Sequence, residues 1–192
     1  MNPSPPLEEI REFVIAGHGD LEKVKQMLEM QPALLGMSYE WGPGDTETAL
    51  QAAAHVGSQD VGLYLLGKGA PLDICTAAML GLKEDVERFL QEDEGNIHAT
   101  GAHGIPLLTH AALSGNVELV QLLVEHGARE GISSALINAV SSGHVEVARW
   151  LLENGEPDVS SKNFQGKTAL EIAVERDDEK IAGLLRAYDA TR

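Results

Sequence analysis

The chain contains a single cysteine, Cys75, among its 192 residues. A disulfide needs two cysteines, so no intrachain disulfide can form. Cys75 lies in an apolar stretch, and we expect it to be a small buried side chain rather than a nucleophile. Aromatic residues are also scarce, at 4% of the chain, so alanine, leucine and valine must fill most of the core.

Neither a secretory signal nor a membrane span is visible in the sequence. Residues 1–9 lack the basic region and the apolar stretch of a signal peptide. No apolar run approaches the ~20 residues that a helix needs to cross a bilayer. These absences favour a cytoplasmic protein that does not enter a membrane.

Basic residues are few as well, with 14 Lys and Arg against 30 Asp and Glu and a net charge of -16. Such a charge keeps a protein soluble and repels the phosphate backbone of nucleic acids. The composition therefore argues against nucleic-acid binding and favours a neutral or basic protein partner.

What the chain does contain is an internal repeat. Six times, a small or aliphatic residue is followed four positions later by Gly or Asp, and an apolar run then begins. The pairs are Ile15/Gly19, Ala53/Gly57, Ala77/Gly81, Ala111/Gly115, Ala139/Gly143 and Ala173/Asp177. Self-similarity at a period of about 20–50 residues is typical of a solenoid, in which each repeat packs only on its neighbours.

Apolar residues within each repeat predict two helices. Positions seven, four and three before the Gly or Asp fall on one face of a first helix, and positions five and eight after it fall on one face of a second helix. The Gly between them suits the left-handed residue that ends a helix. A serine early in the fifth repeat, Ser134, is expected to be a helix N-cap.

The residues of this repeat resemble a known family. Residues 48–57 (Thr-Ala-Leu-Gln-Ala-Ala-Ala-His-Val-Gly) and residues 111–128 resemble ankyrin repeats, whose pattern is Thr-Pro-Leu-His-x-Ala-Ala-x-x-Gly followed by Leu-Leu-x-x-Gly-Ala. Residues 166–173 match the opening of that pattern. The resemblance covers residues 7–188 and implies an all-α fold, an ankyrin-repeat α-solenoid of paired antiparallel helices with a few β-hairpin or loop fingers.

The domain organisation follows from the spacing. We expect an N-terminal tail at 1–6, one ankyrin-repeat domain at 7–188 and a C-terminal tail at 189–192. The expected helix pairs are 7–30, 48–68, 72–92, 106–126, 133–154 and 168–188. Positions 19, 57, 81, 115, 143 and 177 are separated by 38, 24, 34, 28 and 34 residues. Two steps are too short for a hairpin, which leaves long fingers at 31–47, 93–105 and 155–167 in a right-handed stack.

The function implied by the resemblance is a non-enzymatic scaffold for protein–protein interaction. One alternative is a dedicated inhibitor, chaperone or assembly factor of a single enzyme, and a less favoured one is an enzyme or small-molecule binder. No catalytic constellation and no cofactor site is expected. His98, His103 and His110 are spaced by five and seven residues rather than as a helical i, i+4 pair, so no metal site is expected either. A monomer is expected, with a weak homo-oligomer as the alternative.

Ankyrin proteins usually contact partners through finger tips and through the exposed residues just before the Gly of the first helix. Carried over position by position, the expected partner-binding residues are Tyr39, Trp41, His55, Val56, Met79, Leu80, His98, His103, Leu113, Ser114, Ser141, Ser142 and Phe164. For Trp41, the alternatives are an interface anchor and a side chain that folds back to cover a long loop.

Overall fold

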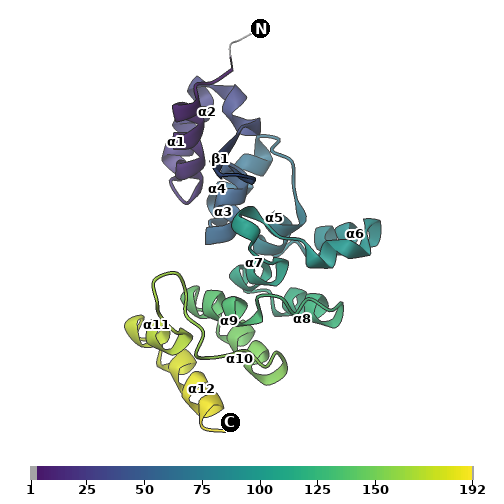
Figure 1. Cartoon of the computed structure of the whole chain (residues 1–192), viewed down its shortest axis with the longest axis vertical. Coiled ribbons are helices and arrows are strands. Elements are labelled where there is room, and N and C mark those ends of the chain that lie inside the picture. Colours follow the sequence, from purple (N-terminus) through teal and green to yellow (C-terminus); the bar gives the residue numbers. More distant parts are fainter. Residues whose placement is uncertain (1–3, 192) are drawn as a thin grey trace.

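The computed structural model describes residues 4–191, and within them twelve α-helices follow one another as six pairs (Figure 1). The helices are α1 (Leu7–Gly17), α2 (Leu21–Met30), α3 (Ala49–Val56), α4 (Gln59–Gly67), α5 (Ile74–Met79), α6 (Lys83–Glu92), α7 (Leu107–Ser114), α8 (Val117–Glu125), α9 (Ile132–Ser141), α10 (Val145–Asn154), α11 (Ala169–Glu175) and α12 (Glu179–Asp189). The odd-numbered first helices pack in one row from α1 to α11, which makes the chain an all-α solenoid.

The turn between the two helices of a pair is set by its left-handed residue. Gly115 follows α7 at φ +75°, and a non-Gly residue, Asp177, takes the same role after α11 at φ +55°. A left-handed backbone costs most residues with a Cβ about 1–2 kcal/mol, and Asp is one of the few that tolerate it. The prediction that this position ends the first helix is therefore confirmed from the second pair onward.

The first pair departs from the predicted register. Its turn is one residue tighter, since the N–H of Asp20 bonds four residues back to the carbonyl of Ala16, whereas the equivalent N–H of Asp178 bonds five residues back to Ala173. Gly19 in this turn lies at φ +139°. The buried positions shift accordingly, so that Val14 is buried while Ile15 is exposed. The interpretation of Ile15 as a core position was wrong, because a Gly pair separated by one residue admits two registers.

The first turns of the helices explain where they begin. The side chains of Thr48 and Thr168 each accept a hydrogen bond from the backbone N–H three residues later. The side chains of Gln51 and Glu171 in turn accept a hydrogen bond from the threonine N–H. These reciprocal caps satisfy otherwise unpaired N–H groups at the starts of α3 and α11. In α9, the N-cap is Gly131, so the prediction that Ser134 caps this helix was wrong.

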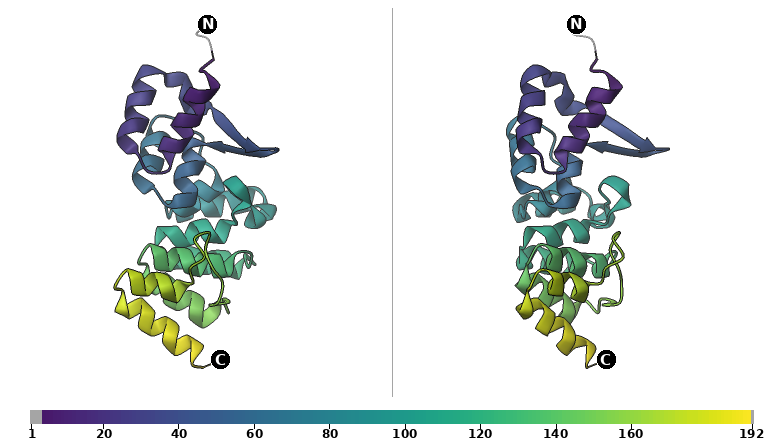
Figure 2. Two further views of the ribbon diagram at one scale, coloured as in Figure 1. Left: turned by 60° about the vertical axis from the view of Figure 1, so that its left-hand side comes forward. Right: turned by 90° about the vertical axis from the view of Figure 1, so that its left-hand side faces the viewer.

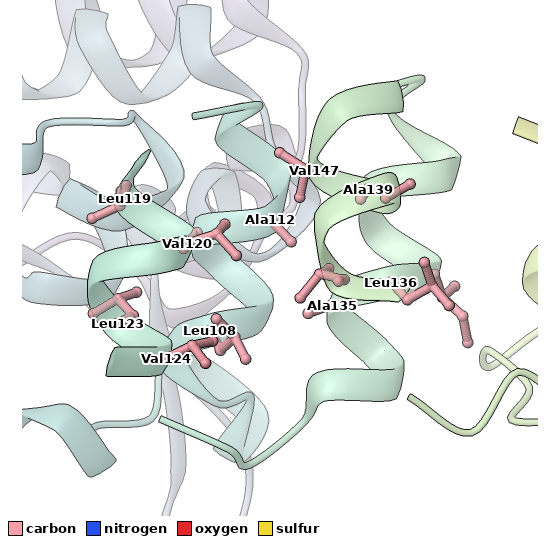
Figure 3. Packing of buried hydrophobic residues seen from close by; sticks show 14 of the residues in the cluster. Leu108, Ala112, Leu119, Val120, Leu123, Val124, Ala135, Leu136, Ala139 and Val147 are labelled. Atoms are coloured by element: carbon pink, nitrogen blue, oxygen red, sulfur yellow. The ribbon is translucent and has the colours of Figure 1, made fainter. Parts of the chain in front are cut away.

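The core consists of two large clusters and one small cluster of buried apolar side chains. One lies under α1 to α4, and the larger one runs from α5 to α12 and includes Leu108, Leu123 and Leu136 (Figure 3). Each fully buried leucine contributes about 1.5–3 kcal/mol to folding. A third, small cluster contains Met79 and Leu113 and lies where α3, α5 and α7 meet. The expected burial of Cys75 is confirmed. Trp150 is partly buried against the larger cluster.

The three long fingers differ in structure. The first forms an antiparallel hairpin of β1 (Ser38–Gly42) and β2 (Asp45–Thr48), which projects from the stack (Figure 2). The second contains the 3-10 helices η2 (Glu94–His98) and η3 (Ala102–Gly104), and the third is a loop. Each of these two contributes a single β-bridge instead of a hairpin. None of the helices within residues 4–191 has the length and apolar character of a membrane span.

Candidate functional site

A groove of about 580 Å³ runs along the first helices on the side where the third finger lies. We call it the inner groove. It is lined by His18, His55, Val56, Ile105, Pro106, Thr109, Ser134, Ile137, Asn138, Lys162, Asn163 and Phe164. These residues come from the turn after α1, from α3, from α7 and the segment before it, from α9 and from the segment before α11, so five distant parts of the chain meet there. In Figure 2 the hairpin and the 155–168 finger extend on the same side of the stack.

Phe164 is the most exposed large apolar side chain of the groove, with 96% of its surface accessible. It sits in a tight turn in which the side chain of Asn163 accepts hydrogen bonds from the backbone N–H groups of Gln165 and Lys167. Gly166 closes the turn at φ +77°. The turn therefore holds an aromatic ring in water at the rim of the groove.

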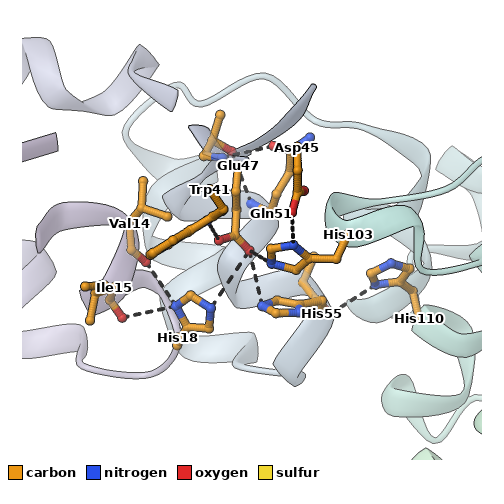
Figure 4. Close-up of polar contacts among 12 residues, drawn as sticks. Val14, Ile15, His18, Trp41, Asp45, Glu47, Gln51, His55, His103 and His110 are labelled. Carbon is orange, nitrogen blue, oxygen red and sulfur yellow. Dashed lines mark hydrogen bonds and ion pairs between the residues drawn. The ribbon is translucent and has the colours of Figure 1, made fainter. Parts of the chain in front are cut away.

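At the N-terminal end of the inner groove, a buried carboxylate is surrounded by three imidazole rings (Figure 4). Glu47 in β2 has 0% of its surface accessible. Its Oε1 atom lies 3.2 Å from Nε2 of His55, 3.5 Å from Nε2 of His103 and 3.9 Å from Nε2 of His18. Its Oε2 atom accepts a 2.7 Å hydrogen bond from the indole N–H of Trp41. We call these five residues the Glu47 cluster.

In two of these rings, the nitrogen that faces away from Glu47 contacts another group. His18 follows α1, and its Nδ1 atom lies 3.1 Å from the carbonyl oxygen of Val14 and 3.2 Å from that of Ile15. His103 in η3 has its Nδ1 atom 2.8 Å from the carboxylate of Asp45. These contacts fix the ring orientations and direct both Nε2 atoms toward Glu47.

Burial sets the charge of the third ring. Loss of solvent, together with the nearby rings of His18 and His103, lowers the pKa of His55 to about 4. His55 is therefore neutral at neutral pH and cannot serve as a cationic partner for Glu47.

The structure places the expected partner-binding residues in three different settings. Val56 and Phe164 are exposed at the inner groove, whereas His55 and His103 belong to the Glu47 cluster. The predicted contact residues Met79 and Leu113 are buried, which corrects their assignment. Both fill the junction between α3, α5 and α7, where successive first helices of unequal spacing pack closely.

The remaining expected residues lie along the stack. His98 is exposed on η2, Leu80 is half-buried at the end of α5, and Ser141 and Ser142 lie at the end of α9. Ser114 donates to the carbonyl of Ala111 and accepts from the backbone of the residue two positions later, so its hydroxyl serves the helix end.

Tyr39 and Trp41 lie on β1 with their rings in edge-to-face contact at 4.8 Å between centroids. Trp41 is 37% exposed and its indole N–H is bonded to Glu47, so the ring covers the hairpin base while one edge remains in water.

Sequence reasoning missed the most buried member of the site, Glu47, and the contact of Asp45 with His103. The two carboxylates are two residues apart in β2 and share a strand face, which is a weak signal on its own. His18, His55 and His103 come from three separate segments, so no spacing along the sequence indicates that they meet.

A model of the family described as ankyrin repeats, in three copies, matches residues 74–163 and 129–191. The matched residues together extend from 74 to 191, which is more than half of the chain. A search of curated proteins found no match. Ankyrin repeats are generally modules of protein–protein interaction and are typically non-enzymatic. With its row of helix pairs and the matched second half, this chain belongs to the ankyrin repeat family.

Proposed function

We propose that this chain is a non-enzymatic scaffold that binds a partner protein in the inner groove, through the third finger and the adjoining first helices. The observation that carries the proposal is the ring of Phe164, held almost fully in water at the rim of an apolar groove. Burying an aromatic ring of this size contributes about 1.5–3 kcal/mol, and such residues are frequent anchors of interfaces.

The lining of the groove supports the same function. Val56, Ile105 and Pro106 offer apolar contact surface, and Asn138 and Lys162 offer polar groups. Protein interfaces usually combine apolar and polar contacts of this kind. The hairpin residues Tyr39 and Trp41 and the more distant His98, Ser141 and Ser142 are proposed as outer contacts.

The charge of the chain defines the kind of partner. With a net charge of -16, the surface attracts a basic or mixed-charge protein and speeds its association. The binding should therefore weaken as salt is raised, because surface charges are screened beyond about 10 Å at 0.1 M ionic strength.

The test compares two variants that each remove one exposed apolar side chain. Phe164→Ser alters the inner groove, and Leu63→Ser alters the exposed outer side of α4 as a matched control. Wild type, Phe164→Ser and Leu63→Ser are each immobilised on a resin and incubated with an extract of the source organism at low and at high salt. The captured proteins are quantified by mass spectrometry.

We expect wild type and Leu63→Ser to enrich one protein, and Phe164→Ser to capture at least about tenfold less of it. A loss of about 1.4 kcal/mol in binding free energy corresponds to this factor of ten. Equal capture by Phe164→Ser and wild type would contradict the assignment of the groove. Capture that rises with salt would contradict the proposed role of charge.

A further inference from the structure

The Oε1 atom of Glu47 is buried and has no hydrogen-bond partner within the described residues, and neither has the Nε2 atom of His55, 3.2 Å away. A buried carboxylate that lacks compensation on one oxygen is strongly unfavourable. We propose that His18, Glu47 and His55 bind a divalent first-row metal ion at this point, with Zn²⁺ the ion best suited to the site. This proposal does not depend on the partner-binding function.

The distances are those of a nearly formed metal site. Ligand atoms about 2.0–2.1 Å from a tetrahedral zinc lie roughly 3.3 Å from one another. The Oε1 atom of Glu47 is 3.2 Å from His55 and 3.9 Å from His18, and the ligand atoms of all three residues lie within 4.8 Å of one another. Small side-chain rotations therefore bring the set to coordination distance. Nε2 of His103 lies 3.5 Å from the same oxygen but outside the set of ligand atoms that approach one another within 4.8 Å.

The outer contacts orient the rings as they do in metal sites. A backbone carbonyl can only accept a hydrogen bond, so Nδ1 of His18, 3.1 Å from the carbonyl of Val14, carries the proton. Nε2 of the same ring faces Oε1 of Glu47 at 3.9 Å. A cation between these two atoms would be coordinated by both.

His103 repeats this arrangement with a carboxylate in the outer position, because its Nδ1 atom lies 2.8 Å from Asp45. Carboxylate–histidine pairs of this kind fix the tautomer of metal-binding rings. Trp41 occupies the other oxygen of Glu47 and leaves Oε1 free for the ion.

The site would connect three elements of the fold. His18 follows α1, Glu47 belongs to β2 and His55 to α3. A bound ion would therefore connect the projecting hairpin to α1 and α3. The side chain of His18 is 33% exposed, which gives an ion a route from solvent.

The proposal is tested by titrating Zn²⁺ alone into the metal-free full chain, prepared without a histidine tag, in an isothermal titration calorimeter. We expect saturable binding of one ion per chain, accompanied by a rise in melting temperature that is complete at one equivalent. His18→Gln and His55→Gln should each weaken binding at least about tenfold, because even residues outside the first coordination sphere cost 10–100-fold when lost.

The control is His98→Gln, which removes an exposed imidazole outside the cluster and should leave the affinity unchanged. Circular dichroism of each metal-free variant establishes that it is folded, and the partly exposed His18 makes His18→Gln the safer of the two cluster variants. Co²⁺ should also give the visible absorption of a four-coordinate ion in wild type but not in His18→Gln.

Absence of saturable Zn²⁺ binding by wild type would overturn the proposal and leave the cluster as a network of imidazoles and carboxylates. Binding that His98→Gln weakens as much as His18→Gln would overturn it as well, since the ion would then sit on surface histidines.

Discussion

Gly17 in α1 lies directly against Ala49 at the start of α3, so that a Cβ added to Gly17 would stand 2.5 Å from the carbonyl oxygen of Ala49 and 2.8 Å from its Cα. Both neighbouring atoms belong to the backbone and cannot rotate away. The contact brings the end of α1 close to α3, and the next residue, His18, reaches the Glu47 cluster as a result.

Replacing Gly17 with alanine should therefore destabilise the protein. The added methyl group must push two helices apart, and overpacking of this kind typically costs 1–3 kcal/mol, about the range we expect here. Urea denaturation followed by circular dichroism measures the change in the free energy of unfolding. The control is Gly183→Ala in the interior of α12, where a Cβ would meet nothing within 4 Å. That change should stabilise by about 0.5–1 kcal/mol, because alanine favours a helix interior. Equal effects of the two substitutions would contradict the close contact.

A second prediction concerns the hydrogen bond from Trp41 to Glu47. Trp41→Phe retains an aromatic ring beside Tyr39 but removes the N–H that reaches Oε2 of the buried carboxylate. A buried acceptor left without its donor costs about 1–3 kcal/mol, so we expect a loss of that size in the free energy of unfolding of the metal-free protein.

Trp150→Phe provides the comparison for this loss. Trp150 is half-buried against the larger core cluster, and its indole N–H makes no hydrogen bond within residues 4–191. Trp41→Phe should therefore be the more destabilising change once the smaller ring volume is allowed for. If the two variants unfold at the same urea concentration, the indole bond contributes nothing and Trp41 is free to act as an interface anchor.

The reactivity of Cys75 follows from its surroundings. Burial, together with the negative charge of Asp73, raises the pKa of its thiol to about 12. Since only the thiolate reacts, Cys75 should be inert to a disulfide reagent in native buffer and should react at once in urea. If labelling requires global unfolding, its rate in native buffer should be on the order of a thousandfold or more below the rate in urea, given ordinary domain stability. Rapid labelling of the native protein, followed by absorbance, would show that α5 opens locally.

The features that the sequence predicts well are those decided by neighbouring residues. A left-handed Gly such as Gly115 is local, because it depends on the backbone of one residue. The repetition of this signal along the chain is what makes the solenoid recognisable. The predicted register of the first turn was wrong because Gly17 and Gly19 offer equivalent local signals. Only the packing of Gly17 against Ala49 selects one of them.

The site depends on contacts that no local pattern encodes. Met79 and Leu113 occupy positions that the repeat pattern predicts to be exposed, yet both are buried where α3, α5 and α7 meet. His18 and His55 are close only because α1 and α3 lie side by side, and Glu47 joins them only because the first finger forms a hairpin rather than a loop. Sequence alone could propose a histidine-containing surface but not the carboxylate that organises it.

The last prediction tests the larger core cluster at its centre. Leu123 in α8 is fully buried, and Leu123→Ala should lower the free energy of unfolding by ~2–5 kcal/mol, as large-to-small changes in cores do. Leu63→Ala in α4 removes the same atoms from an exposed side chain and should change stability by no more than about 0.5 kcal/mol. Both variants are compared with wild type by urea denaturation at one temperature. Stacked repeats are stabilised by the interfaces between neighbours. Leu123→Ala should therefore shift the whole unfolding transition to lower urea concentration rather than divide it into two transitions. A change at Leu123 no larger than that at Leu63 would mean that α8 does not pack on α7 as the structure shows.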